Sequence, residues 1–293
     1  MSARTGAIAA AALAVLLLVL LPLALHLGLR AHSDFELLLG DDPGPPGNAL
    51  ALALALVIDH ELDGTTGWRP NDLVIWGPAA ADNNSNRQLG ILQGLRETVR
   101  VFKDHLTKVS SENYDDNLVE ADNLLRNDPT KWMLPSAESR YRDAAGALRS
   151  YAAGLSGEPA RSRPINVRTI ELMRLVQAWT DLLGAAHADL YRDDIGFFET
   201  DDVYYRATGR CHTLAYAVAA IEVDYRGELD RRPVLTQLLE EVRVPLQACA
   251  RAKPLVVLAG HDTSLRANHL RNLDAHVVEA RQKLYSVRDE LEK

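Results

Sequence analysis

The sequence has few of the residues that build covalent or metal-bound cores. Only two of its 293 residues are cysteine, and neither a Cys-x-x-Cys pair nor a His-Glu-x-x-His motif occurs. Two cysteines are too few for a scaffold held by disulfides, and both motifs that commonly bind zinc are missing. We therefore expect no metal and no cofactor.

Positive charge and aromatic side chains are also scarce. The net charge is −8, and aromatic residues make up 6 % of the chain. Proteins that bind nucleic acid usually carry an excess of Lys and Arg, so this balance argues against a nucleic-acid partner. The abundant residues are Ala, Leu and Arg, which are strong helix formers, and they favour an all-α fold.

One stretch looks like part of an active site. An apolar run, residues 255–258, is followed by Gly260, His261, Asp262 and Thr263, an order similar to the proton-donor corner of histidine phosphatases. Such an enzyme also needs a nucleophilic histidine in an Arg-His-Gly loop, and the sequence has none. We expect Gly260 to end a segment and Asp262 or Thr263 to cap the last helix.

Other polar pairs have simpler explanations than catalysis. His187 and Asp189 are two residues apart, so on a helix they point to different faces and suit a solvated helix end. The pair at 201–202 precedes a helix, where carboxylates complement the helix dipole. Glu138 and Arg142 have the spacing of a surface ion pair. We therefore predict no catalytic residue and no enzymatic activity.

The longest apolar run lies near the N-terminus. Residues 6–29 are apolar or small with the exception of one histidine, and Arg4 and Arg30 flank them. About 20 such residues cross a bilayer, so we expect a short tail at 1–5 and an uncleaved transmembrane helix at 6–30, with a cleavable signal peptide as the alternative. This arrangement predicts a single-pass protein of the bacterial inner membrane with a periplasmic body.

A linker and a helical body follow the apolar run. Residues 31–47 contain no Lys or Arg and end in a stretch rich in Pro and Gly, so we interpret them as a linker. We interpret residues 48–293 as one soluble body. Its first segment, residues 49–62, alternates Ala and Leu, and because Ala is too small for the exposed face of a strand, we predict a short buried helix there.

Further along the body, apolar side chains recur three and four residues apart. This spacing predicts amphipathic helices that pack as a mostly antiparallel bundle. The seams run over residues 92–109, 141–155, 172–186 and 273–291. The last seam is an unbroken heptad pattern. We expect it to pack along the body, and a homo-oligomer formed through this helix is the alternative.

The two cysteines fall on facing seams of a predicted helical hairpin. Residues 203–226 and 234–252 fold into an antiparallel pair about residue 230, so that facing positions have numbers that sum to 460. Cys211 then faces Cys249. In an oxidising compartment we expect a disulfide between them, and two buried thiols are the alternative.

A long loop provides the candidate interaction surface. Residues 67–84 are rich in Gly, Pro and Asn and contain Trp68, Asn71, Asp72 and Trp76. Loops of this length in compact domains are often functional. The alternative is that both tryptophans fill the end of the bundle while Asn71 and Asp72 bind backbone groups.

Several stretches resemble the bacterial DUF2333 family, whose members have an N-terminal membrane helix and no assigned function. The matching stretches are GWRPND (67–72), ADNNSNRQLGIL (81–92), PSAESRY (135–141), DDVYYRATG (201–209), AIEVDYRGEL (220–229) and ANHL (267–270). The resemblance implies a location and an architecture but no catalytic residues. We therefore expect a non-enzymatic, membrane-anchored scaffold or adaptor that contacts other cell-envelope proteins. The alternatives are a sensor that binds a small ligand or lipid between its helices, and a hydrolase.

Overall fold

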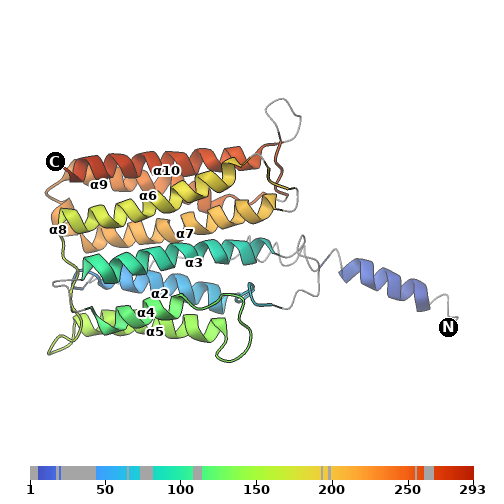
Figure 1. The fold of residues 1–293 in the computed structure, drawn as a ribbon, viewed down its shortest axis with the longest axis horizontal. Helices are drawn as coiled ribbons and strands as arrows, with labels where there is room; N and C mark the ends of the chain where they lie inside the picture. The colour runs from blue at the N-terminus through green and yellow to red at the C-terminus, as the bar shows by residue number, and fades with distance from the viewer. Residues whose placement is uncertain are drawn as a thin grey trace.

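The computed structural model describes residues 6–17, 20, 44–64, 66–72, 82–107, 114–192, 194–196, 199–254, 256–260 and 267–293. Their secondary structure is helical, apart from one isolated bridge between Ala259 and Asn268 (Figure 1). The predicted all-α class is therefore confirmed. The helices of the body are α2 (Asn48–Asp63), α3 (Asn83–Val101), the π-helix η2 (Phe102–Leu106), α4 (Asp116–Leu125), α5 (Ala137–Leu155), α6 (Thr169–Tyr191), α7 (Thr200–Asp224), α8 (Arg226–Leu229), α9 (Pro233–Arg251) and α10 (His269–Leu291).

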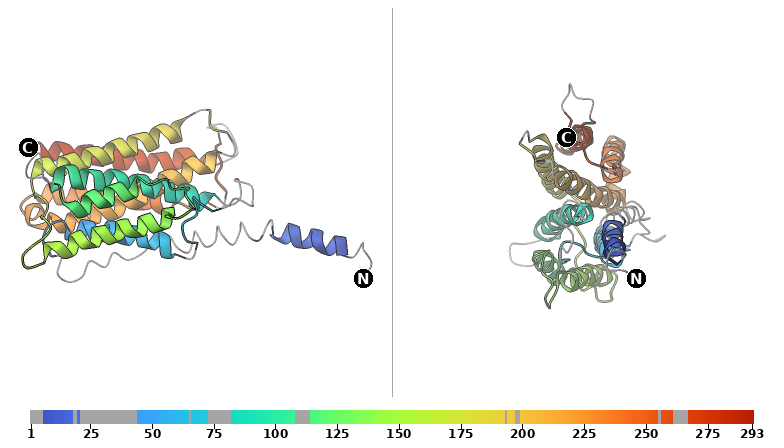
Figure 2. Two further views of the ribbon diagram at one scale, coloured as in Figure 1. Left: turned by 60° about the horizontal axis from the view of Figure 1, so that its bottom comes forward. Right: turned by 90° about the vertical axis from the view of Figure 1, so that its right-hand side faces the viewer.

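The long helices of the body lie side by side with similar axis directions, and the view along them in Figure 2 shows an elongated cross-section. The closest neighbours are α3 with α7, α10 with α6 and α9, and α2 with α5. Antiparallel pairs predominate, as predicted. The α3–α7 pair is parallel, because Asn86 bonds to Asp202 while Gln93, two turns later, bonds to Arg210.

Helix α2 forms where the Ala-Leu alternation predicted a buried helix. The side chains of its alanines and leucines are almost all buried, and so are Val57 and Ile58. Small alanines let neighbouring helices approach on every side, so the segment is buried all round and does not present one polar face. This places α2 at the centre of its half of the bundle, between α5 and α7.

The contact between α3 and α7 depends on glycine. A Cβ atom on Gly90 would lie 2.0 Å from the backbone oxygen of Arg206, and one on Gly209 would lie 2.0 Å from the backbone oxygen of Arg87. Only a residue without a Cβ fits at either position. The two helices therefore touch backbone to backbone near their N-termini.

The hairpin of α7 and α9 has the register that the sequence predicted. Cys211 lies beside Cys249, and burial followed by this neighbour raises the pKa of the Cys249 thiol. The seam residues of α9, from Leu235 to Cys249, are buried against α7, and Pro245 is accommodated inside the helix. Both cysteines are free in the structure, so the expected disulfide is not formed there.

The last helix packs along the body, as expected. Its heptad residues from Leu273 to Leu291 are buried against α6 and α9. The expectation for its cap was wrong, because the helix begins at His269 and the side chain of Asn268 accepts a hydrogen bond from the Arg271 amide at 3.1 Å. Asp262 and Thr263 lie outside the described residues.

Residues 6–17 are helical and exposed along their whole length. Across the described part of the chain, no helix has both the length and the apolar character needed to cross a bilayer. Of the segment 6–30 in which we expected the membrane helix, residues 18, 19 and 21–30 fall outside that part.

Candidate interaction site

Two loops contact each other at the end of the bundle where α2 ends and α3 begins. We call residues 66–72, which follow α2, and residues 126–136, between α4 and α5, the interlocked loops. Trp68 is buried, its ring packs edge-on against Tyr141 with centroids 4.9 Å apart, and its Nε1 donates a hydrogen bond to the Pro129 backbone oxygen at 2.9 Å. A buried indole needs both apolar contact and a partner for its N–H, and it has both here. Trp68 thus fixes the loop after α2 to the loop between α4 and α5.

Asn71 adds a second attachment between the same loops. Its Nδ2 donates to Glu138 Oε2 at 2.8 Å and to the Lys131 backbone oxygen at 3.2 Å. The same Lys131 oxygen accepts a hydrogen bond from the amide of Ala137 at 2.8 Å. The base of the α4–α5 loop, from Pro129 to Ala137, is therefore held from both sides.

The four residues proposed from the sequence as an interaction surface differ in their exposure and contacts. Trp68 and Asn71 are buried supports, which agrees with the alternative that the sequence left open. Asp72 is exposed and forms an ion pair with Arg69. Trp76 lies outside the described residues. Trp68 and Asn71 therefore hold the α4–α5 loop in place and do not themselves form an exposed surface.

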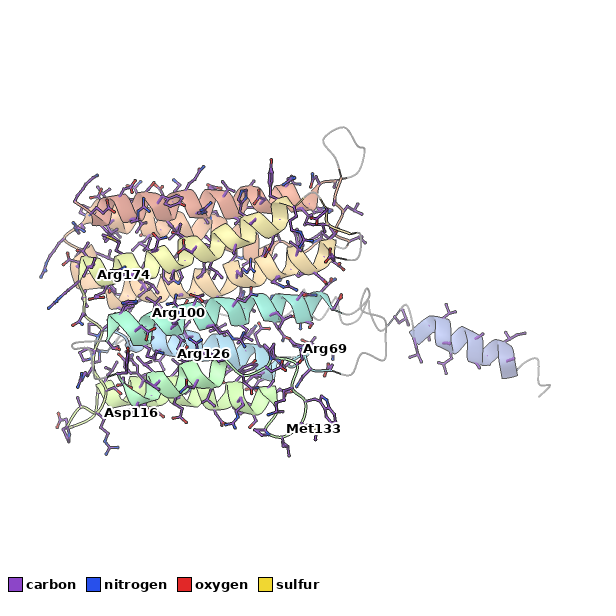
Figure 3. All side chains as sticks on the ribbon, in the orientation of Figure 1. Arg69, Arg100, Asp116, Arg126, Met133 and Arg174 are labelled. Atoms are coloured by element: carbon purple, nitrogen blue, oxygen red, sulfur yellow. The ribbon has the colours of Figure 1, made fainter. Side chains whose placement is uncertain are left out.

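That loop carries an apolar tip that the sequence analysis overlooked. Trp132, Met133 and Leu134 have exposed fractions of 63 %, 61 % and 91 %. We call these three residues the apolar tip; Figure 3 shows Met133 and Arg69 at one end of the bundle, with Asp116 and Arg174 toward the other. A signal was present in the sequence, because three large apolar residues in a row between helices do not belong to any seam.

A buried ion pair lies behind the interlocked loops. Arg87 Nη1 bonds to both carboxylate oxygens of Glu61 at 2.9 Å, and both side chains are 3 % exposed. Gln88 next to it bonds to the Gly67 oxygen and accepts from the Arg69 amide. An adjoining cavity of about 10 Å³, lined by Glu61, Trp68, Tyr141 and apolar side chains, has room for about one water molecule.

A cluster of carboxyl groups joins the N-termini of α3 and α7. Burial, followed by the charges of Asp202 and Asp201, raises the pKa of Asp82 to about 7. Asp82 and Asp202 share a hydrogen bond, Asn86 donates to Asp202 Oδ1 at 2.6 Å, and Arg206 donates to Asn86 Oδ1 at 2.8 Å. The cluster links α3 to α7. From the sequence we expected Asp201 and Asp202 only to complement the dipole of the helix that follows them.

The other polar pairs from the sequence have partners on neighbouring helices. His187 Nδ1 lies 2.7 Å from Asp274 Oδ1, and Asp189 pairs with Arg210 at 3.0 Å. Arg142 pairs with Asp63 of α2 at 2.8 Å, so the expected pair with Glu138 was wrong. In the described ranges, no group of three or more His, Cys, Asp or Glu side chains is placed to hold a metal ion.

A comparison with protein-family models matched residues 40–193 to DUF2333, described as an uncharacterized protein conserved in bacteria. The match covers slightly more than half of the chain and includes α2 to α6, with the interlocked loops and the apolar tip. No curated protein and no solved structure matched the chain.

Proposed function

The chain belongs to the DUF2333 family of bacterial proteins, and we propose that it is a non-enzymatic scaffold or adaptor of the cell envelope. In this proposal residues 6–29 anchor it in the inner membrane, residues 31–47 are a spacer, and the helical body contacts other envelope proteins from the periplasmic side.

The apolar helix at residues 6–17 is the observation that supports the proposed membrane anchor. Its large side chains are exposed, and they include Ile8, Leu13, Val15, Leu16 and Leu17. A helix that is apolar all round is unfavourable in water and suits the interior of a bilayer. The apolar sequence continues to residue 29, which gives the length that a membrane crossing needs.

The body suits a scaffold because its polar side chains serve to hold helices together. Arg87 with Glu61, Arg210 with Asp189 and Asn86 with Asp202 each link two different helices. Such cross-links favour a stiff body with one arrangement of its surface. An adaptor that presents fixed sites to partners needs that stiffness.

Fractionation and a topology reporter test the anchor. The full chain should stay with membranes at alkaline pH, and a reporter active only in the periplasm should be active when fused after Lys293. Leu13→Arg with Leu16→Arg should release the protein, whereas Val234→Arg, at an exposed position on the body, should not. Release of the unaltered chain, or activity of a cytoplasm-only reporter, would contradict the proposal.

Crosslinking in intact membranes tests the adaptor role. The full chain should crosslink to one or a few envelope proteins in stoichiometric amounts, and the same proteins should co-purify after detergent extraction. A chain that yields only crosslinks within itself would count against a scaffold.

A further inference from the structure

We propose that the apolar tip, Trp132-Met133-Leu134, inserts into the surface of the lipid bilayer and gives the body a second contact with the membrane. The inference rests on the proposed anchor at residues 6–29, which brings the body close to a bilayer. In this proposal the tip, and not the anchor, orients the bundle relative to the bilayer.

The tip is built to stay exposed. Its three side chains point away from the core, while the loop that carries them is held at its base by Trp68, Asn71 and the amide of Ala137. A loop that could fold back would bury its apolar residues against the bundle. The contacts of Trp68, Asn71 and the Ala137 amide hold the base of the loop in the position in which the tip is exposed, and such an exposed apolar cluster marks a candidate contact site outside the chain.

The composition of the tip fits a lipid surface. Tryptophan favours the region of the headgroups, and Met and Leu next to it can enter the acyl-chain boundary. The nearby charges, Lys131 and Arg140 against Asp128 and Glu138, cancel. Insertion should therefore depend on apolar contact and only weakly on salt.

The size of the tip also favours lipid over protein. Three side chains offer roughly a few hundred Å², which is less than the ~800 Å² per partner of a standard protein interface. Two further exposed apolar residues, Tyr191 at the end of α6 and Val256 before α10, lie at the same end of the bundle. They extend the apolar character of the end face without forming one continuous patch with the tip.

The chain is long enough for both contacts. The body begins at α2, whose first turn lies beside Asp224 at the end opposite the tip. The longest helix, α7, has 25 residues and spans about 37 Å. The 14 residue-to-residue steps from Arg30 to Gly44 can reach about 46–50 Å when extended. An anchor joined to one end of the body therefore still lets the other end touch the same bilayer.

A probe on the tip tests the proposal in the full chain. Met133→Cys is labelled with an environment-sensitive fluorophore, and the protein is reconstituted into phosphatidylcholine vesicles that contain lipids brominated in the acyl chains. Cys211 and Cys249 are buried, so the new thiol reacts first. The matched control is Ile170→Cys, an exposed position near the start of α6, at the opposite end of the bundle.

Bromolipid should quench the probe at 133 at least threefold more than the probe at 170. Adding Trp132→Ser and Leu134→Ser should abolish the difference, and 1 M salt should change it less than twofold. These three residues are exposed, so the fold should be retained, which circular dichroism checks.

Equal quenching at both positions, in protein that floats with the vesicles, would overturn the tip contact and leave the anchor intact. Protein that does not float with the vesicles would overturn both. A probe at 133 that responds to protein concentration but not to bromolipid would show that the tip binds another protein, which also overturns the proposal.

Discussion

Asp224, at the end of α7, caps the N-terminus of helix α2, a role that a residue next to the helix in sequence usually has. Helix α2 begins after Gly47, which has no side chain to cap it, and the carboxylate of Asp224 accepts hydrogen bonds from the amides of Ala49 at 3.1 Å and Leu50 at 2.9 Å. The charge also complements the positive end of the helix dipole. One residue thus caps α2 and ties it to α7.

Asp224→Ala should lower the free energy of unfolding by about 1–2 kcal/mol, because it leaves buried amide groups without an acceptor. Urea denaturation followed by circular dichroism measures the change. Asp230→Ala is the control, since Asp230 is exposed, and it should alter stability by less than about 0.5 kcal/mol. Equal effects of the two substitutions would show that the cap does not contribute.

The carboxyl pair Asp82 and Asp202 should make the free energy of unfolding depend on pH between about 4 and 7. Burial and the charges of Asp202 and Asp201 raise the pKa of Asp82 to about 7, from an ordinary value of 3.8. Between these values the folded protein holds a proton that the unfolded chain releases, so the free energy of unfolding should fall as the pH rises from about 4 to 7 and should level off above that.

Asp82→Asn supplies the matched test of this titration. The amide can still donate a hydrogen bond to Asp202 but cannot ionise, so between about pH 5 and 7 the variant should lose a large part of the fall in the free energy of unfolding. It should also be more stable than the original chain at pH 8.5. Urea titrations at several pH values measure both effects, and parallel pH profiles for the two proteins would contradict the assignment.

The close contact between helices α3 and α7 depends on Gly209. Gly209→Ala should destabilise the protein by about 1–3 kcal/mol or more, because the new Cβ meets the backbone of α3 and the helices must move apart. Gly146→Ala in α5 is the control, since nothing lies within 4 Å of its Cβ, and it should stabilise the protein by up to about 1 kcal/mol. Thermal unfolding measures both, and shifts of the same sign would contradict the close contact.

The same elements show what the sequence could predict. The register of α7 on α9 follows from the spacing of apolar residues alone, because a seam must face a seam, and the position of Cys211 beside Cys249 confirms it. The cap of α2 could not be predicted, since Asp224 is separated from Ala49 by most of the chain. Arg142 likewise had a suitable partner four residues away, and only the packing of α2 on α5 gave it Asp63 instead.

The candidate site was only partly predictable for a related reason. The sequence predicted an interaction surface at Trp68 and Asn71 because they are a large aromatic and an amide in a long loop. The structure places both inside the interlocked loops. The exposed residues lie in the other loop, and sequence spacing does not show which of two loops covers the other. Only the fold determines which of these residues are buried, and burial distinguishes the supporting residues Trp68 and Asn71 from the exposed apolar tip.

The heptad seam of α10 is the feature that bears on how many chains form the folded unit. The heptad seam of α10 is suited in principle to pairing with another chain, but its residues are buried within this one, and Leu284 is fully buried among them. The seam is therefore occupied before any second chain can bind to it.

Leu284→Asp should consequently destabilise the single chain, by roughly 3 kcal/mol or more, because it places a carboxyl in an apolar interface. Urea denaturation would show a lower midpoint that does not depend on protein concentration. Gln282→Asp, at a position outside the buried seam of the same helix, is the control for helix propensity and added charge. If Leu284→Asp instead left a folded monomer and removed an oligomer seen by analytical ultracentrifugation, the seam would belong to an interface between chains, and α10 would have to leave the body to form it.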